Sequence, residues 1–249
     1  MIGAGDGRTV TLRGTMTDRE LLRATIKVCM FDQYGTVVDM QSGLVEAATP
    51  FLNRKGWAGN ANSFVTWWRR THFENSMIDA LLGREHTPYR EIGERAVSFV
   101  MDRAGIQHTP EEAHDLVAAI EQLKPFPEVP AALDRLRKRY KLVVLSNGDP
   151  DRLERARRYH GIAFDQLISV SVAGAFKPHR ATYERAAALV GVARDQVLFV
   201  ANHAFDCIGA KSTGMRTAFI DRRRRPFGAT PHQPDLIVPS MTELAAVIG

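Results

Sequence analysis

Short runs of consecutive apolar residues recur along the chain, and most of them end in polar residues. The runs are apolar throughout and do not alternate, which is typical of strands buried on both faces of a sheet. Segments with one apolar side at helical spacing follow the runs. Strands that alternate with helices predict an α/β fold with a parallel sheet and helices on both faces. We expect strands at 26–31, 141–145, 197–200, 216–220 and 236–238, and helices at 128–139, 151–160, 180–190, 205–213 and 241–248.

More than a hundred residues separate the first two predicted strands, and they have helical patterns only, at about 43–55, 62–82, 88–104 and 110–123. An insert of this kind, placed directly after the first strand, predicts a helical cap domain over 39–124. The chain returns at Pro125-Phe126-Pro127, so the core comprises 23–38 and 125–249. Residues 1–22 are polar and Gly-rich without an apolar stretch, which predicts a loose N-terminal extension and no signal peptide.

Composition narrows the class of protein. No apolar run approaches the ~20 residues that a membrane helix needs, so we expect no membrane span. Cys29 and Cys207 both fall in apolar segments. Two buried, reduced thiols are the favoured interpretation over a disulfide, and they indicate a cytoplasmic protein.

The net charge is +5, and one dense basic cluster, Arg222 to Arg225, precedes Pro226. Such a cluster either binds nucleic acid or is a solvated loop. The sequence favours the solvated loop, because no nucleic-acid-binding motif accompanies the cluster. We therefore expect no nucleic-acid partner.

Polar residues that could take part in catalysis stand at the ends of three predicted strands and in one loop. In a parallel sheet, ligands bind beyond the carboxyl ends of the strands. Taken singly, an Asp at a strand end is usually a helix cap, and a Lys in a loop is usually solvated. Their joint placement at one edge predicts an active site made from Asp32, Ser146-Asn147, Lys177, Asn202-His203 and Asp206.

These segments stand in the order of four known motifs. Phe31-Asp32-Gln33-Tyr34-Gly35-Thr36 is similar to the first motif of the haloacid dehalogenase superfamily. Ser146-Asn147-Gly148, Lys177-Pro178 and the segment Asn202 to Asp206 are similar to the second, third and fourth. The resemblance runs from about residue 26 to the C-terminus, and it implies a Rossmann-like core with an inserted helical cap.

Two departures from the common pattern of the superfamily select a branch. Most members are magnesium phosphatases, which carry a second Asp two residues after the nucleophile. Here that position is Tyr34, and a free tyrosine titrates near ~10, too high for an acid catalyst at neutral pH. Asn202 stands where a second magnesium ligand is common. The resemblance is therefore closer to the L-2-haloacid dehalogenases, which implies hydrolysis without metal or organic cofactor.

The resemblance assigns roles residue by residue. Asp32 would displace halide from the carbon beside a carboxylate, and water would then release a 2-hydroxy acid from the enzyme ester. Thr36 would hold the Asp32 carboxylate or stabilise the ester, and Lys177 would keep Asp32 ionised. Ser146 and the backbone amides of Gln33 and Tyr34 would bind the substrate carboxylate. Asp206 would orient Lys177 or the hydrolytic water. Tyr183 matches a family active-site tyrosine, and Asn202 would lie at the substrate site.

The cap supplies a halide site in this resemblance. Arg69 would bind the departing halide with help from Asn147, and Tyr89 would line the same pocket. Arg70 is the alternative if the register differs by one. Ala201 and His203 replace the Ser and Asn of typical L-2-haloacid dehalogenases, while some haloacetate dehalogenases have His at the second position. His203 either assists fluoride or water, or only packs.

The sequence thus predicts a hydrolytic dehalogenase for a small 2-haloacid, either a haloacetate or an L-2-haloacid. The alternatives are another superfamily hydrolase, either a phosphatase or a carbon–nitrogen hydrolase, and a non-catalytic nucleic-acid-binding protein. The halogen, the chain length and the stereochemistry stay open. Relatives are often dimers, which makes a homodimer the expected assembly.

Overall fold

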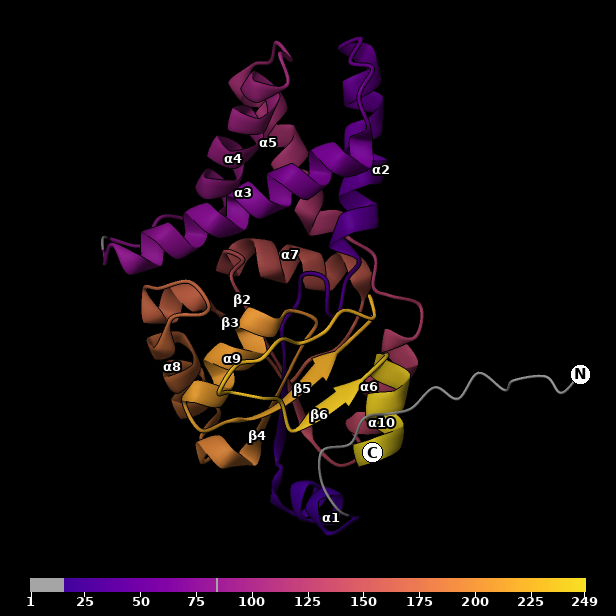
Figure 1. Ribbon diagram of the computed structural model, residues 1–249, viewed down its shortest axis with the longest axis vertical. Helices are drawn as coiled ribbons and strands as arrows, with labels where there is room; N and C mark the ends of the chain where they lie inside the picture. The colour runs from indigo at the N-terminus through magenta and orange to yellow at the C-terminus, as the bar shows by residue number, and fades with distance from the viewer. Residues whose placement is uncertain (1–15, 84) are drawn as a thin grey trace, which may run out of the picture.

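The computed structural model describes residues 16–83 and 85–249, and it has a helical part above an α/β core (Figure 1). The core is a six-stranded, fully parallel sheet in the order β3-β2-β1-β4-β5-β6. This confirms the predicted α/β class with a Rossmann-like core and an inserted cap. The strands are β1 (Val28–Phe31), β2 (Lys141–Ser146), β3 (Gln166–Ser169), β4 (Val197–Ala201), β5 (Arg216–Ile220) and β6 (Leu236–Val238).

Strand β1 lies at the centre of the sheet, between β2 and β4. Its successive side chains point to opposite faces, and both faces are covered. Cys29 and Phe31 pack into one apolar cluster, whereas Val28 and Met30 pack into the other. Burial on both faces explains why the strand is apolar at every position. Cys29 and Cys207 are buried and free, as expected.

Helices cover both faces of the sheet. Helices α6 and α10 contribute to the cluster that contains Phe31, and α8 and α9 contribute to the cluster that contains Met30. Among the described residues, no helix is long and apolar enough to cross a membrane. The core helices are α1 (Met16–Thr25), α6 (Val129–Leu136), α7 (Pro150–His160), α8 (Arg180–Val190), α9 (Ala204–Ser212) and α10 (Met241–Ile248), with 3-10 turns at Val170–Ala173 and Arg194–Gln196.

Part of the predicted N-terminal extension can be described. Helix α1 covers positions 16–25, and Leu22 within it and Ile26 directly after it are buried. The Arg23 guanidinium donates to the Gly249 carbonyl over 2.9 Å, which ties α1 to the C-terminus. The prediction for 1–15 lies outside the described residues.

The helical part is inserted between β1 and β2. It comprises α2 (Met40–Arg54), α3 (Ala61–Leu81), α4 (Tyr89–Arg103), α5 (Pro110–Ala118) and the 3-10 turn Ala119–Gln122. Side-chain caps begin several of these helices: Asp39 accepts from the Ser42 amide, and Thr109 with Glu112 forms a capping box. Val38 and Pro125 form an antiparallel bridge where the chain leaves and re-enters the core. The domain boundaries at 38/39 and 124/125 stay a prediction.

Asp149 of the core fixes the start of cap helix α4. Its carboxylate oxygens accept from the backbone amides of Tyr89 and Arg90 over 2.9 and 3.1 Å. Pro88, the residue before α4, offers no side-chain cap, so a core carboxylate satisfies amides that would otherwise be unpaired. Because Tyr89 belongs to the cavity described below, this contact sets the position of a cavity residue.

Candidate active site

Asp32 follows β1 directly and lies at the carboxyl edge of the sheet, with 6% of its surface exposed. The Asp32 amide continues the pairing with β4 by donating to the Val200 carbonyl over 3.0 Å. The chain then turns sharply, since the amides of Val37 and Val38 both donate to the Gln33 carbonyl. The Asp32 carboxylate is thereby held on a rigid strand end beside a tight turn.

Lys177 supplies a cation to this carboxylate. Its Nζ donates to Asp32 Oδ1 over 2.7 Å, to Asp206 Oδ2 over 2.6 Å and to the Leu145 carbonyl over 3.1 Å. The three acceptors use all three protons of the ammonium. The backbone amide of Lys177 also donates to Asn147 Oδ1 over 3.0 Å, which anchors the loop before α8.

Lys177 and the two carboxylates of Asp32 and Asp206 stabilise each other's charged forms. Burial alone would raise the pKa of Asp32, but the Lys177 ammonium and then His203 stabilise the carboxylate, and the pKa lies well below its usual range. Burial would likewise lower the pKa of Lys177, yet Asp206 and Asp32 raise it above its usual value. Asp32 is therefore an ionised carboxylate at neutral pH, as a nucleophile must be.

The second carboxylate oxygen is held by Thr36. Its hydroxyl donates to Asp32 Oδ2 over 2.7 Å and accepts from the backbone amide of Asn202 over 2.9 Å. The turn is fastened from outside as well, because Arg222 Nη2 donates to the Thr36 carbonyl over 3.0 Å. Both oxygens of Asp32 thus have a fixed hydrogen-bond donor.

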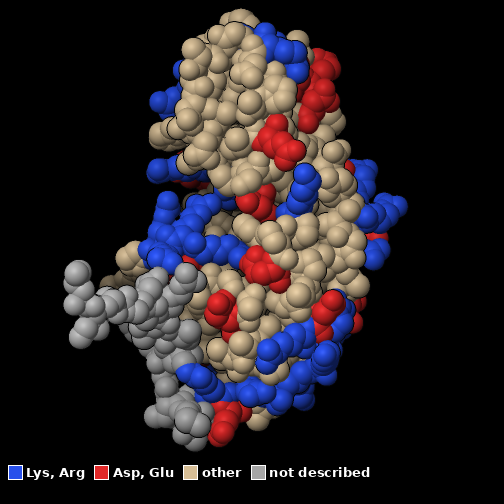
Figure 2. Space-filling view, turned by 90° about the vertical axis from the view of Figure 1, so that its right-hand side faces the viewer, with Lys and Arg blue, Asp and Glu red and all other residues tan. Residues whose placement is uncertain are grey.

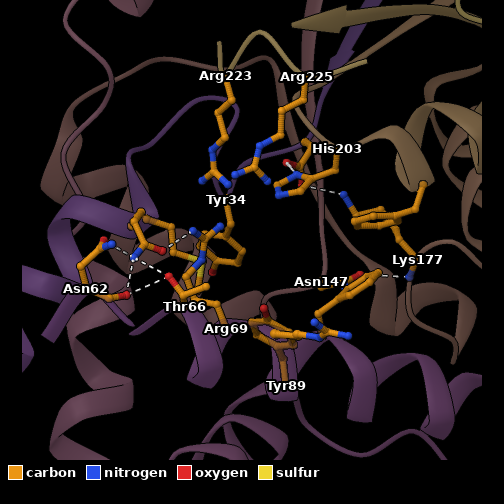
Figure 3. Close-up of a pocket in the computed structure, with 16 residues that line it drawn as sticks. Tyr34, Asn62, Thr66, Arg69, Tyr89, Asn147, Lys177, His203, Arg223 and Arg225 are labelled. Atoms are coloured by element: carbon orange, nitrogen blue, oxygen red, sulfur yellow. Dashed lines mark hydrogen bonds and ion pairs between the residues drawn. The ribbon is translucent and has the colours of Figure 1, made fainter. Parts of the chain in front are cut away.

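A cavity of about 570 Å³ opens above Asp32, between the core edge and the cap (Figure 3). It brings together residues far apart in the sequence. The predicted site residues that line it are Asp32, Tyr34, Arg69, Tyr89, Asn147, Lys177 and His203. Asp32 is the only carboxylate among the described residues that line this cavity, whereas five lysine or arginine side chains do so, namely Arg69, Arg70, Lys177, Arg223 and Arg225.

Arg69 and Arg70 both line the cavity but differ in their surroundings. Arg69 is partly buried, and its Nη1 donates to Gln41 Oε1 over 2.8 Å, a neutral partner. Burial lowers the pKa of Arg69, and the nearby Arg223 acts in the same direction. Arg70 is exposed and paired with Glu74 over 2.7 Å. Of the two, Arg69 is therefore the guanidinium that can still pair with an anion.

Tyr34 and Tyr89 form a stacked pair, with ring centroids 5.9 Å apart and planes at 7°. The Tyr34 hydroxyl lies so close to the chain of the second motif that a Cβ at Gly148 would come within 2.5 Å of it. Burial raises the pKa of Tyr34 well above its usual range, and Tyr89 adds to the shift. Tyr34 is therefore a neutral wall of the cavity.

Several predicted residues do not reach the cavity. Ser146 is fully buried and does not line the cavity, and its hydroxyl accepts from the Gly148 backbone amide over 3.2 Å, so its role toward the substrate carboxylate stays a prediction. Tyr183 is also buried and donates to Asp206 Oδ1 over 2.5 Å. The side chain of Asn202 turns away and donates to the Ile220 carbonyl over 2.5 Å. Gln33, Thr36 and Asp206 likewise lie beneath the cavity wall.

His203 stands at the cavity beside Asp32. Its Nδ1 lies 3.6 Å from Asp32 Oδ2, and about 29% of its side chain is exposed. The turn leaves little room for it: Gly35 has a φ of 89°, and a Cβ there would come within 3.0 Å of the His203 ring. The ring also lies against Phe205, with centroids 5.4 Å apart. His203 therefore faces the Asp32 carboxylate.

Other lining residues were not predicted from the sequence. Asn62, Thr66 and Phe73 recur with Arg69 at spacings of three and four, so they share one face of α3. Helical periodicity anchored on Arg69 could have found them. Arg223 and Arg225 follow β5 at the same sheet edge. Arg223, Arg224 and Arg225 are exposed, as expected of a solvated loop, but Arg223 and Arg225 also line the cavity and Arg222 is largely buried.

Comparisons with known proteins agree with this geometry. A family model for haloacid dehalogenase-like hydrolases matches residues 26–214. The chain is 31% identical over 227 residues to haloacetate dehalogenase H-2 of Moraxella sp. (strain B), covering 90% of this chain and 98% of that protein. It is 32% identical over 228 residues to the (S)-2-haloacid dehalogenase of Pseudomonas sp. (strain YL), covering 90% and 93%.

A solved structure is similar as well. The L-2-haloacid dehalogenase from Xanthobacter autotrophicus with chloropropionic acid covalently bound superposes with a TM-score of 0.79 at 27% identity, covering 90% of this chain and 98% of that chain. The chain therefore belongs to the haloacid dehalogenase-like hydrolases. Within that family its relatives are haloacetate and (S)-2-haloacid dehalogenases, the branch that the motifs resemble.

Proposed function

We propose that the protein is a hydrolytic dehalogenase of small 2-haloacids that works through an ester of Asp32. The arrangement that carries the proposal is an ionised Asp32 on the cavity floor, held by Lys177 and Thr36. Tyr34 occupies the place where a phosphatase of the superfamily would need an acid, and burial raises its pKa further. Displacement of halide needs no acid at that place.

In the first step, a carboxylate oxygen of Asp32 attacks the carbon that bears the halogen, and halide leaves with the bonding electrons. Arg69 faces the cavity with no carboxylate in ion-pair contact, which suits it to receive the anion, and Asn147 lies on the same cavity wall. Among the described residues, none accepts a hydrogen bond from the backbone amides of Gln33 or Tyr34. These amides are free for the substrate carboxylate.

In the second step, water attacks the carbonyl carbon of the Asp32 ester. The bond to the substrate oxygen breaks, the product leaves as a 2-hydroxy acid, and one oxygen of Asp32 now comes from water. Lys177 stays beside the carboxyl group to stabilise the charge that develops on it. His203, 3.6 Å from Asp32 Oδ2, lies close enough to position the water.

We further propose that the reaction requires no metal or organic cofactor. Lys177 Nζ already lies between the carboxylates of Asp32 and Asp206, with both in ion-pair contact. Asn202 stands where a second carboxylate ligand is common, and its side chain donates to the Ile220 carbonyl instead of facing these carboxylates. The two free, buried cysteines support a cytoplasmic location, and a homodimer stays a prediction.

The test measures both the reaction and its intermediate. Chloride and fluoride release from haloacetates and 2-halopropionates should be abolished in Asp32→Asn, which keeps the size of the side chain. In a single turnover in heavy-oxygen water, the label should enter Asp32 of the wild-type protein. A label found only in the product would mean direct attack by water and would refute the ester.

The same panel distinguishes the alternatives. Release of inorganic phosphate from phosphate esters, or of ammonia from an amide beside a carboxylate, would instead assign the protein to another hydrolase activity of the family. A nucleic-acid role is not favoured by the basic cluster, since Arg222 pairs with Glu128 and its neighbours line the cavity.

A further inference from the structure

The loop after β5 is fixed against the catalytic turn by Arg222. Its guanidinium pairs with Glu128, donates to the Thr36 carbonyl over 3.0 Å and lies 4.0 Å from the centre of the Phe126 ring. Next in the loop, Arg224 has a φ of 50°, and the Arg225 amide donates to Asp221 Oδ1 over 2.9 Å. A non-glycine residue keeps such a conformation only where its surroundings determine it. The loop is therefore built in a defined shape.

This shape turns two arginines toward the reacting centre. Figure 3 shows Arg223 and Arg225 pointing from the loop into the cavity, toward His203 and Tyr34. Figure 2 shows basic side chains gathered beside the hollow between the cap and the core. Neither guanidinium has an ion pair or hydrogen bond with any residue in the described part of the chain.

The cavity consequently has uncompensated positive charge. Lys177 is paired with Asp32 and Asp206, and Arg70 is paired with Glu74. Arg223, Arg225 and Arg69 have no carboxylate in ion-pair contact within the described residues. A monocarboxylate substrate needs one anion site for its carboxylate and one for the departing halide, and the amides after Asp32 and Arg69 supply both. Two guanidiniums remain without an anion.

The size and lining of the cavity point the same way. Its volume of about 570 Å³ falls in the range that holds ligands much larger than a three-carbon acid. The cap side adds the neutral polar groups of Gln41, Asn62 and Thr66, which are hydrogen-bonded to one another. Met40, Phe73 and Phe205 line other parts of the cavity. Beside the two arginines, a charged end group is favoured over an alkyl one, because burying a guanidinium against an alkyl chain costs free energy.

We propose that Arg223 and Arg225 form a second anion-binding subsite that selects 2-halo acids with a distal carboxylate, that is, 2-halodicarboxylates. The proposal rests on the dehalogenase function proposed above. Asp32 would react at the carbon next to the first carboxylate, and the distal carboxylate would accept hydrogen bonds from the guanidiniums. Arginine suits this task because its fork of donors matches a carboxylate.

The test compares substrates that differ only at the far end. 2-Chlorosuccinate is paired with 2-chlorobutyrate, and 2-chloroglutarate with 2-chlorovalerate, so that a carboxylate replaces a methyl group. We expect kcat/KM to favour the dicarboxylate in at least one pair. In the double variant Arg223→Gln/Arg225→Gln, that preference should fall about 10- to 100-fold, because each charged hydrogen bond contributes strongly. Arg224→Gln, which removes the same charge from the same loop outside the cavity, should leave the preference unchanged.

A binding measurement tests the subsite independently of the reaction. Calorimetry on Asp32→Asn protein, which cannot turn over, should give tighter binding of the dicarboxylate than of its monocarboxylate partner, and the double variant should lose the difference. Equal losses for both members of each pair would mean general attraction of anions and would overturn the subsite. Absence of halide release from every acid, with the binding preference intact, would instead refute the proposed reaction.

Discussion

At the scale of single residues, the site depends on how one ammonium is shared. Lys177 Nζ contacts Asp32, Asp206 and a backbone carbonyl, and Tyr183 holds the far oxygen of Asp206. Removal of any member would leave a buried charge without its partner, which is costly in a low-dielectric interior. We therefore expect Tyr183 and Asp206, which do not line the cavity, to position Lys177.

The two adjacent arginines of α3 should differ in their effect on catalysis. Arg69 is partly buried with a neutral partner, and Arg70 is exposed and paired with Glu74. Arg69→Ala should lower kcat for chloroacetate by about 10²- to 10³-fold, the usual cost of removing a group that stabilises developing negative charge. Arg70→Ala is the matched control and should retain activity within a few-fold. A larger loss in Arg70→Ala, measured by chloride release, would place the halide site one residue further along.

His203 should matter most for the poorest leaving halide. Fluoride is a strong hydrogen-bond acceptor, so it gains most from a donor that strengthens as charge develops. His203→Asn should lower kcat/KM for fluoroacetate by roughly tenfold relative to chloroacetate and bromoacetate, the effect of one lost hydrogen bond. An equal fall for all three would assign His203 to ester hydrolysis, and an unchanged series would leave it a packing role beside Gly35.

At the scale of elements, periodicity located most of the fold because buried strands and amphipathic helices have distinct patterns. Strand β3 escaped prediction since it is short and lies at the sheet edge, and its first two residues are only partly buried. The predicted strand ends, together with one loop, identified Asp32, Lys177 and Asp206 as a group. Sequence alone did not separate residues that line the cavity, such as Asn147, from those beneath it, such as Ser146, because side-chain direction after a strand depends on the turn that follows.

Helix α3 contains a buried imidazole that should make stability depend on pH. His72 stacks on Tyr89 with ring centres 3.9 Å apart, its Nε2 lies 3.0 Å from the Tyr89 carbonyl, and burial lowers its pKa to about 4. In the unfolded chain the imidazole titrates near ~6.5. Between these values the unfolded state binds more protons, so stability falls as the pH drops from about 6.5 to 4. The loss through this group should reach on the order of 3 kcal/mol.

Denaturant unfolding over this pH range measures the effect. His72→Phe keeps a stacking ring and replaces Nδ1, which has no partner in the described structure, by carbon. The variant should lose stability less steeply on acidification than the wild-type protein. Parallel curves for the two proteins would show that His72 is not the group responsible.

At the scale of the whole molecule, we expect the polypeptide alone to be sufficient for the reaction. The cation beside Asp32 is supplied by Lys177, which comes from the chain itself. Halide release should therefore persist after exhaustive treatment with EDTA, with the rate unchanged within error. A magnesium-dependent phosphatase tested in parallel is the control for complete chelation. Loss of dehalogenase activity that magnesium restores would contradict the proposed metal-free chemistry.

The central position of β1 also determines how the chain must fold. Among the described residues, this strand pairs only with β2 and β4, whose first residues in register, Lys141 and Val197, lie more than a hundred residues further along. The loop closure that joins such distant segments is entropically costly, and folds with this arrangement form slowly. During synthesis, Asp32 is made early, but its backbone partner in β4 is made much later. The Asp32 carboxylate can therefore be held in place only after about four-fifths of the protein has been synthesised. An apolar strand that waits this long without neighbours is a segment that a chaperone would bind.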